Sequence, residues 1–274
     1  SELPKVLHSV DGKTMIQHVV ERVHALGIEE IIVVVGYKRE MVINHLRQVV
    51  PELRLRYTIQ EKQLGTGHAV MMARPYLQGF RGRVLVLYGD MPLINPRTIR
   101  RLIEACQSEV KATLLTIVLD NPPDFGRIVR DESGRVLRVV EVQDATPEER
   151  AIREVNVGMY CFDSEALLTA LGHLRNDNAQ GEYYLTDVIG EIVQSGGRVE
   201  TVVAETLEET LGINDQNHLR FAEALKHIQY AESLYELIDA TLAMTRAREA
   251  CRTGNHGQDE GERMGQAVRK EKQR

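Results

Sequence analysis

The sequence lacks the cysteine and histidine patterns of disulfide-stabilised and zinc-binding proteins. Its three cysteines, Cys106, Cys161 and Cys251, are scattered, odd in number and form no C-x-x-C pair. This pattern indicates reduced cysteines rather than disulfide bridges or zinc ligands. The nine histidines include no H-x-x-x-H pair, which also disfavours a zinc site on a helix.

Long apolar runs and a basic excess are missing as well. No apolar segment approaches the length of a membrane span, and no signal peptide is present. The formal net charge of −6 argues against a nucleic-acid partner, because such proteins usually carry a basic excess. We therefore predict a cytoplasmic protein without a membrane or nucleic-acid partner. The oligomeric state stays unknown.

What the sequence does contain is an alternation of strand and helix patterns. Hydrophobic residues make up 43% and charged residues 27% of the 274 positions, as in ordinary globular proteins. Strands are expected at about 31–35, 53–59, 83–88, 112–119, 155–162 and 199–204, and helices at about 14–26, 39–50, 66–73, 95–106, 165–171 and 187–194. The alternation predicts an α/β protein with a Rossmann-like, doubly wound, mostly parallel sheet.

Two further segments depart from this alternation. Residues 126–130 and 135–142 flank Asp131-Glu132-Ser133-Gly134, a β-hairpin signature that places an excursion beside the sheet, as a lid for a second substrate. A short helix is expected after Thr146-Pro147. We predict a main domain at 1–225, a C-terminal helical segment at 226–251 and a disordered tail at 252–274, where Gly, Gln and charged residues dominate.

The strand at 83–88 ends in Tyr88-Gly89-Asp90-Met91-Pro92. Its continuous apolar run predicts burial on both faces, as in parallel sheets. Ligands of open α/β sheets bind at the carboxyl ends of the strands, and a carboxylate there suits Mg²⁺ shared with substrate phosphates. Taken alone, however, the pattern favours a turn or capping role for Asp90.

Other candidate residues are equally ambiguous when taken singly. The Gly65-Thr66-Gly67 loop opens a helix, as anion sites do, but it is neither a Walker loop nor G-x-G-x-x-G, and a plain loop explains it as well. Lys5 is either a phosphate contact or a solvated lysine. Asn214 is either the N-cap of the following helix or a second cation ligand.

A carboxylate and an amide also lie on or beside the excursion strands. Glu141, Asn156 and the backbone at Gly126 suit the hydroxyls and the N-acetyl group of a sugar. Taken singly, each of them is explained equally well as an ordinary polar residue on the protein surface.

Together these motifs resemble a known family. They occur in the order of the uridylyltransferase domain of the bacterial bifunctional N-acetylglucosamine-1-phosphate uridyltransferases, which also carry a glucosamine-1-phosphate acetyltransferase domain, and the resemblance covers about residues 1–225. The motifs are Leu3-Pro4-Lys5-Val6-Leu7, Gln60, Gln63-Leu64-Gly65-Thr66-Gly67-His68-Ala69, Tyr88-Gly89-Asp90-Met91-Pro92-Leu93, Phe125-Gly126-Arg127-Ile128, Glu141, Asp144-Ala145, Glu154-Val155-Asn156-Val157-Gly158, residues 178–187 and Gly212-Ile213-Asn214.

The resemblance implies a role for each matching position. The implied nucleotide contacts are Lys5 to phosphate, Gln60 with the Gly65 and Thr66 backbone to uracil, and Tyr88 with Gly89 to ribose and phosphate. The implied Mg²⁺ ligands are Asp90 and Asn214, and Lys5 and Asp90 are the implied catalytic residues. The implied N-acetylglucosamine contacts are Gly126, Glu141 and Asn156, closed on the sugar side by the stretch that includes Tyr184 and Thr186.

The implied reaction is uridylyl transfer from UTP to N-acetylglucosamine 1-phosphate. The sugar-phosphate oxygen attacks the α-phosphorus and expels pyrophosphate, giving UDP-N-acetylglucosamine. A phosphate monoester with a second pKa near 6 is already mostly ionised at pH 7. The reaction therefore needs positioning, charge neutralisation and the metal rather than a side-chain base.

Three departures from the family pattern limit this expectation. The family's Gly-rich strand-loop, Leu-Ala-Ala-Gly-x-Gly-Thr-Arg-Met, is not in the chain, which begins at Ser1 as a processed product or a fragment would. We expect its absence to expose sheet edges and to lower the rate by about 10² to 10⁵. Gln143 stands where the family usually has a lysine. No hexapeptide-type repeats follow residue 225, so the acetyltransferase β-helix is absent.

Two alternative functions remain open at this point. A non-catalytic nucleotide-sugar binding protein, or an inactive fragment, is the alternative that the missing loop favours. A dinucleotide-dependent oxidoreductase shares the strand-helix alternation, but the sequence lacks G-x-G-x-x-G followed by a ribose-binding acid.

Overall fold

A computed structural model describes residues 3–213, 218–222, 224–225, 238 and 241–244. The chain divides into two compact units, residues 1–222 and 223–274, and only the first is described below. The predicted helical segment at 226–251 lies outside the described residues except at 238 and 241–244, and the predicted tail at 252–274 lies wholly outside them. No helix in the described part of the chain is long and apolar enough to span a membrane.

The amino-terminal part is a small α/β layer with a core of its own. A one-turn helix (Lys5–Leu7) and the short hairpin β1 (Ser9–Val10) and β2 (Lys13–Thr14) lead into α1 (Met15–Ala25). Strands β3 (Ile31–Val35) and β4 (Leu55–Ile59) pair in parallel, with α2 (Arg39–Val49) between them. Apolar side chains of α1, α2 and β3 pack into one cluster. The Thr14 hydroxyl caps α1 by accepting from the Gln17 N–H at 3.4 Å, in agreement with the helix expected at about 14–26.

The next segment leads into the strand that precedes Asp90. It consists of α3 (Thr66–Met72), α4 (Arg74–Leu77), β5 (Arg83–Val86) and α5 (Pro96–Ala105). The Asn95 side chain caps α5 by accepting from the Arg97 N–H at 2.9 Å, as the Asn-Pro pair predicts. Helix α4 is an element that the sequence analysis did not expect.

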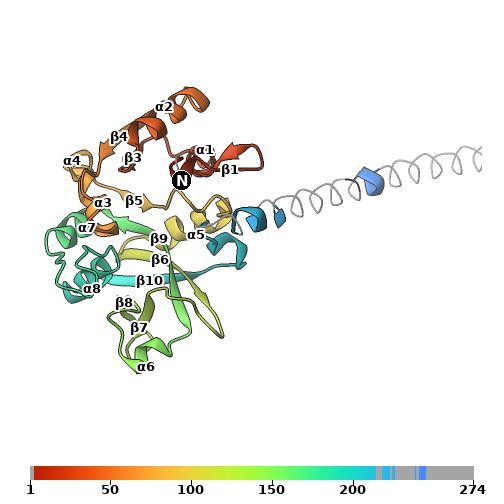
Figure 1. Cartoon of the computed structure of the whole chain (residues 1–274). Helices are drawn as coiled ribbons and strands as arrows, with labels where there is room; N and C mark the ends of the chain where they lie inside the picture. Colours follow the sequence, from red (N-terminus) through yellow and green to blue (C-terminus); the bar gives the residue numbers. More distant parts are fainter. Residues whose placement is uncertain (1–2, 214–217, 223, 226–237, 239–240, 245–274) are drawn as a thin grey trace, which may run out of the picture. The chain divides into compact units, whose positions relative to one another are not determined.

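The main sheet has six strands in a mixed arrangement. Besides β5 it contains β6 (Val110–Val118), β7 (Arg127–Arg130), β8 (Val136–Val140), β9 (Glu154–Asp163) and β10 (Arg198–Val203). Strands β6 and β10 pair in parallel, whereas β9 is antiparallel to β5, β6 and β7. In Figure 1 these strands cross the middle of the unit, with hairpin β7–β8 at one end and β3 and β4 at the other.

Strand β9 organises this sheet. One of its edges pairs with β6 over most of its length. Its other edge holds two strands end to end, because β5 pairs with residues 160–163 and β7 pairs at Val155. The register shifts between Leu114 and Thr116 opposite the intervening stretch of β9. Gly158 lies in that stretch with a φ of +91°.

The remaining helices cover the sheet and close the hairpin excursion. Helix α6 (Pro147–Arg150) begins with a complete capping box formed by Thr146 and Glu149, as Thr146-Pro147 predicts. Helices α7 (Ser164–Leu171) and α8 (Asp187–Gln194) pack their apolar faces into one cluster with the inner residues of β6, β8 and β9.

The α/β class, the hairpin excursion and the element order are confirmed. Strand β5 was expected to be buried on both faces, and Val84 and Val86 do pack against one core cluster while Leu85 packs against another, but all four of its residues are only half-buried. Within the described residues β5 pairs only with β9, and β3 pairs only with β4. One edge of β5 is therefore covered by β9, whereas its other edge pairs with no strand of the described residues.

Candidate active site

The carboxyl end of β5 forms one side of the candidate site. Gly89 lies close to α1, because an added Cβ would stand 2.8 Å from Ile16 Cδ1, and a larger residue would require the Ile16 side chain to shift. The Asp90 backbone carbonyl accepts from the Ile213 N–H at 3.0 Å. This contact joins the turn after β5 to the segment that precedes Asn214, while Asn214 itself lies outside the described residues.

Lys5 and Asp90, the two predicted catalytic residues, form an ion pair. The side chains keep 40% and 23% of their exposure, so both can reach a ligand from solvent. No group of three or more His, Cys, Asp or Glu side chains in the described ranges could hold a metal ion. Asp90 is thus a single carboxylate at a sheet rim, with an ammonium beside it.

The predicted uracil loop is held by the predicted sugar-side stretch. Gly65 has a φ of +103°, and a Cβ added there would stand 2.7 Å from the Tyr183 carbonyl oxygen. The Gly67 N–H donates to that same carbonyl at 2.8 Å, and the Tyr183 N–H donates to the Leu64 carbonyl at 2.8 Å. The Leu185 N–H donates to the Thr66 hydroxyl at 3.1 Å. Residues distant in sequence therefore fix the shape of the loop.

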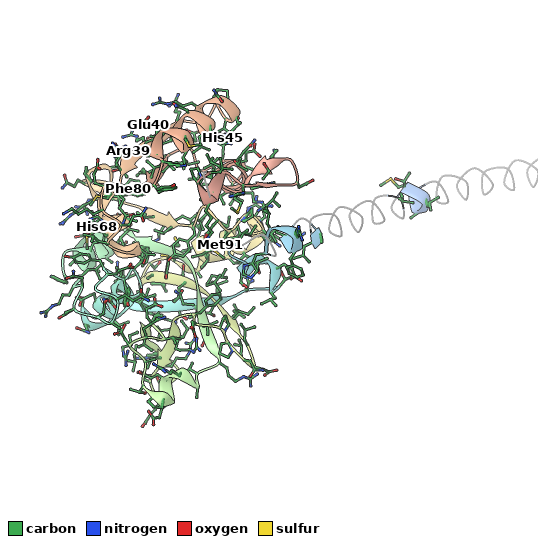
Figure 2. The ribbon with its side chains drawn as sticks, in the orientation of Figure 1. Arg39, Glu40, His45, His68, Phe80 and Met91 are labelled. Atoms are coloured by element: carbon green, nitrogen blue, oxygen red, sulfur yellow. The ribbon has the colours of Figure 1, made fainter. Side chains whose placement is uncertain are left out.

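Gln60, at the end of β4, reaches this loop with its side-chain amide. Its Nε2 donates to the Gly65 carbonyl oxygen at 3.0 Å and lies 3.1 Å from His68 Nδ1. His68 comes from the first turn of α3 (Figure 2) and stacks on Tyr183 with ring centroids 6.2 Å apart. His68 directly follows the Gly-Thr-Gly loop, but its sequence position alone predicted no role for it.

The Tyr88 side chain links the nucleotide side of the site to the sugar side. Its ring lies against Gly158, where an added Cβ would stand 2.4 Å from Tyr88 Cε2. Burial raises the pKa of Tyr88 to about 12, and the nearby carboxylate of Glu141 adds to the rise, while hydrogen bonds with Tyr160 and Thr66 oppose it. The Tyr88 hydroxyl is therefore neutral and fixed between the two sides.

Tyr160 is a second tyrosine of this network and is fully buried. Its hydroxyl oxygen accepts from Asn156 Nδ2 at 2.8 Å, and Asn156 Oδ1 accepts from the Gly158 N–H at 3.2 Å. The Asn156 amide is therefore locked in one orientation. Sequence reasoning gave Tyr160 no role because it reads as an ordinary strand residue.

The four predicted sugar contacts on this side lie close together. The Asn156 N–H donates to the Gly126 carbonyl at 2.8 Å, and an added Cβ at Gly126 would stand 3.5 Å from the Glu141 carboxylate. The Thr186 hydroxyl donates to Glu141 Oε1 at 2.8 Å. Burial raises the pKa of Glu141. A backbone carbonyl, an amide, a hydroxyl and a carboxylate thus share one wall.

The acidic surroundings of this wall extend to α8. Tyr184 is buried, and burial raises the pKa of its hydroxyl to about 12, with the charge of Asp144 adding to it. Burial, together with the charges of Glu141 and Asp144, raises the pKa of Asp187 to about 6. Gln143, the position of the family's lysine, is exposed.

Arg127 supports the wall from behind. Its side chain is only 4% exposed, and its guanidinium donates to the carbonyls of Pro123 at 2.8 Å and of Arg150, at the end of α6, at 3.2 Å. It also donates to the Phe125 carbonyl. One buried cation therefore fixes the loop that ends in Gly126.

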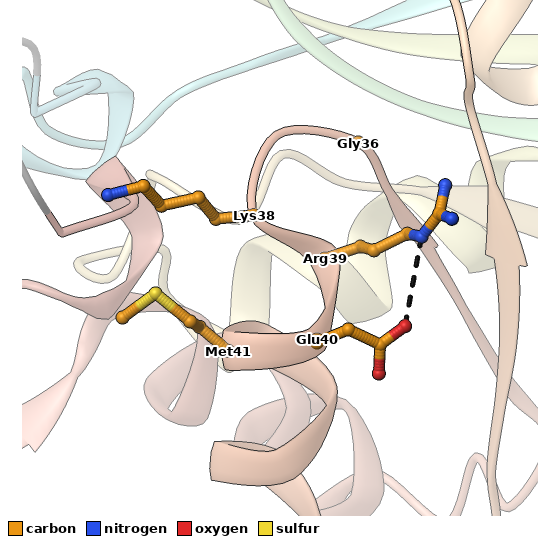
Figure 3. A pocket seen from close by; sticks show the side chains of 5 residues that line it. All are labelled: Gly36, Lys38, Arg39, Glu40 and Met41. Atoms are coloured by element: carbon orange, nitrogen blue, oxygen red, sulfur yellow. Dashed lines mark ion pairs between the residues drawn. The ribbon is translucent and has the colours of Figure 1, made fainter.

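A separate hollow of about 490 Å³ opens at the start of α2. Its lining residues are Gly36, Lys38, Arg39, Glu40 and Met41 (Figure 3). The dashed line in Figure 3 marks the ion pair between Arg39 and Glu40 at 3.7 Å. None of the predicted site residues lines this hollow.

Comparison with known proteins gives a consistent result. A family model described as nucleotidyl transferase matches residues 1–207. The bifunctional protein GlmU of Geobacillus sp. (strain WCH70) is 49% identical over 222 residues, which cover 81% of this chain and 47% of that protein. The bifunctional protein GlmU of Halalkalibacterium halodurans is 49% identical over 224 residues (81% and 48%). That of Streptococcus suis is 45% identical over 226 residues (82% and 48%).

The chain spans about half the length of the curated relatives it matches. The similarity bears out the resemblance read from the ordered motifs.

Proposed function

This chain belongs to the nucleotidyl transferase family, and on that premise we propose that it transfers a uridylyl group from UTP to N-acetylglucosamine 1-phosphate. The observation that carries the proposal is the network around Tyr88. Tyr88 contacts Thr66 on one side and Tyr160 on the other, and Tyr160 in turn is hydrogen-bonded to Asn156. Tyr88 precedes Asp90 by two positions. These contacts support a site in which the proposed nucleotide loop, Asp90 and the proposed sugar contacts are held together through Tyr88.

The sugar-phosphate oxygen forms a bond to the α-phosphorus of UTP while the bond to the β-phosphate oxygen breaks. The leaving group is pyrophosphate, and no proton has to be removed from the attacking phosphate at pH 7. Lys5 supplies a positive charge for the phosphates, where charge accumulates during the transfer. Neutral Tyr88 adds no charge to this region and holds the two sides at a fixed separation.

The residues present suit a divalent cation such as Mg²⁺. Asp90 is an oxygen ligand that is partly exposed, and Mg²⁺ in such enzymes is bound by one or two protein oxygens together with substrate phosphates. When bound, it neutralises phosphate charge and orients the phosphates. Asn214, the proposed second ligand, follows the Ile213 backbone that is hydrogen-bonded to Asp90.

The sugar wall supplies recognition rather than chemistry. The Glu141 carboxylate accepts from a sugar hydroxyl, the locked Asn156 amide faces the N-acetyl group, and the backbone at Gly126 lies beside both of them. Tyr184 and Thr186 close this side by way of the Thr186 contact to Glu141. We place UTP on the Gln60, Gly65 and Gly89 side.

The test combines turnover with binding. The protein is mixed with UTP, Mg²⁺ and N-acetylglucosamine 1-phosphate, and released pyrophosphate is measured. Binding of UDP-N-acetylglucosamine is measured in parallel by calorimetry. Pyrophosphate release that requires both substrates is the expected result. Binding without release would favour the alternative of a non-catalytic nucleotide-sugar binding protein, and the absence of both would overturn the proposal.

A further inference from the structure

The amide group of Gln60 has both of its hydrogens engaged by the protein. The Nε2 atom of Gln60 lies 3.0 Å from the Gly65 carbonyl oxygen and 3.1 Å from His68 Nδ1. A carbonyl oxygen can only accept, so the amide atom facing it must be the nitrogen. The two N–H bonds of that nitrogen therefore point at Gly65 and His68.

This geometry also fixes the state of His68. Because the amide nitrogen donates to Nδ1, that ring nitrogen carries no proton and the imidazole is the neutral Nε2–H tautomer. The stacking of the ring on Tyr183, with centroids 6.2 Å apart, holds it in place. The Tyr183 backbone is itself bonded to Leu64 and Gly67.

Only the oxygen of the Gln60 amide is left to face a ligand, and it can only accept a hydrogen bond. Uracil presents an N3–H donor on its pairing edge, whereas cytosine has an unprotonated acceptor at N3. A site that offers an acceptor therefore forms a hydrogen bond with uracil. With cytosine, the acceptor of the site faces the acceptor of the base.

We propose that His68 is a positioning residue that strengthens the selectivity of the site for uridine over cytidine nucleotides, by holding the Gln60 amide, together with the Gly65 carbonyl, with its oxygen toward the base. The proposal rests on the assignment of Gln60 to the nucleotide base in the proposed function. Without the acceptor at His68, the Gly65 carbonyl alone opposes a turned amide, so turning to present an N–H to cytosine gives up one hydrogen bond instead of two.

The experiment compares the dissociation constants of UTP and CTP, measured by calorimetry with Mg²⁺ on the intact chain. Wild type is expected to prefer UTP by about 10- to 100-fold, as an unpaired acceptor implies. His68→Phe keeps a ring to stack on Tyr183 but removes the acceptor, and it is expected to lower this preference about 5-fold, the usual effect of one hydrogen bond, with little loss of UTP affinity. His68→Asn is expected to restore much of the preference, because its amide oxygen can accept in place of Nδ1.

The control is the same exchange at a histidine on the surface. His173 pairs with Glu191 at 3.3 Å on exposed parts of the fold, and His173→Phe is expected to leave the preference unchanged. His68→Leu gives the same test if His68→Phe does not fold, because leucine also lacks the acceptor.

A His68→Phe protein that keeps the full preference for UTP would overturn the role of His68 while leaving the proposed function intact. A parallel loss of UTP and CTP affinity would also overturn it, because His68 would then be supporting the loop in general. A wild-type protein that binds neither nucleotide would instead overturn the proposed function, and this inference with it.

Discussion

The ammonium of Lys5 is paired with the carboxylate of Asp90, 85 positions further along the chain. The pair joins the first turn of the described chain to the rim of the main sheet. Both side chains retain solvent exposure, and pairs of this kind contribute only about 0–1 kcal/mol to stability. The pair is therefore of little importance for folding, which is consistent with the ligand-binding role proposed for both residues.

Asp90→Asn is expected to lower kcat/KM for uridylyl transfer by about 10² to 10³, the usual effect of removing one group that stabilises charge in the transition state. Its unfolding midpoint in urea should stay close to that of wild type. Asp163→Asn is the matched control, since Asp163 pairs with Arg83 at 2.9 Å at the opposite end of β5 and has nearly the same exposure, 22%. Equal losses in the two variants would make Asp90 a structural residue.

Chelation gives a second test of the same rim. Removal of divalent cations with EDTA should abolish pyrophosphate release, and Mg²⁺ should restore it. In Asp90→Asn, the concentration of Mg²⁺ needed for half-maximal activity should rise, because one oxygen ligand has lost its charge. The measurement is the initial rate against free Mg²⁺, and an unchanged midpoint contradicts the assignment of Asp90 as a ligand.

Gly65→Ala is expected to weaken UTP binding at least 10-fold and to destabilise the protein. The residue has a φ of +103°, and its Cβ would stand 2.7 Å from the Tyr183 carbonyl. Gly79→Ala is the control, because Gly79 has a φ of +78° but open space around it. The control should lose only the conformational cost of about 1–2 kcal/mol and keep its affinity for UTP. Similar affinity losses in both variants would show that the contact with Tyr183 is unimportant.

Arg127→Met is expected to weaken the sugar contribution to binding by about 10-fold. The Arg127 guanidinium donates to four backbone carbonyls, three of which belong to the loop before Gly126. Methionine fills the same space but cannot donate to these carbonyls. The readout is the ratio of dissociation constants for UDP and UDP-N-acetylglucosamine, with UDP affinity unchanged.

Arg138→Met, on the exposed side of the same hairpin, is the control for this ratio, because its guanidinium pairs with Glu149 of α6. If Arg127 served stability alone, Arg127→Met would lower the fraction of binding-competent protein and leave the ratio unchanged.

Asp187→Asn is expected to stabilise the protein above about pH 6 and to have little effect near pH 4. The pKa of Asp187 is raised to about 6 in the folded protein, from near 3.9 in an unfolded chain. A raised pKa means that the folded state binds the proton more tightly, so wild type loses stability as the pH rises between these values.

Two units of pKa correspond to about 3 kcal/mol, which partial exposure of Asp187 reduces to about 1 kcal/mol. Urea unfolding midpoints between pH 4 and 8 measure the difference. A constant difference across this range would show that Asp187 does not titrate there.

The elements were predictable where local signals define them. Helix starts are predicted by residue types that cap helices, and the caps are present at Thr14, Asn95 and Thr146. The extent of burial of β5 was not predictable, because it depends on which strands lie beside it. The antiparallel placement of β9 between β5 and β6 likewise rests on pairings between residues far apart in sequence.

The site shows the same division. Single residues such as Lys5 and Glu141 carried weak signals, and only their ordered combination pointed to a family. His68, although it belongs to the Gln63–Ala69 motif, and Tyr160 received no role because they contact other site residues rather than a proposed ligand. The position of His68 directly after Gly65-Thr66-Gly67 was the available signal, since a residue in the first turn of a helix faces the loop that precedes it.

The arrangement of β5 and β7 along one edge of β9 limits how far these two strands can move apart. Tyr160, which pairs with the end of β5, and Asn156, whose N–H donates to the Gly126 carbonyl just before β7, are four positions apart on one continuous strand. Four residues of extended chain span at most about 13 Å. The turn that carries Asp90 and the loop that ends in Gly126 are thus tied to each other by covalent backbone, and they cannot move apart without a break in the pairing of β9.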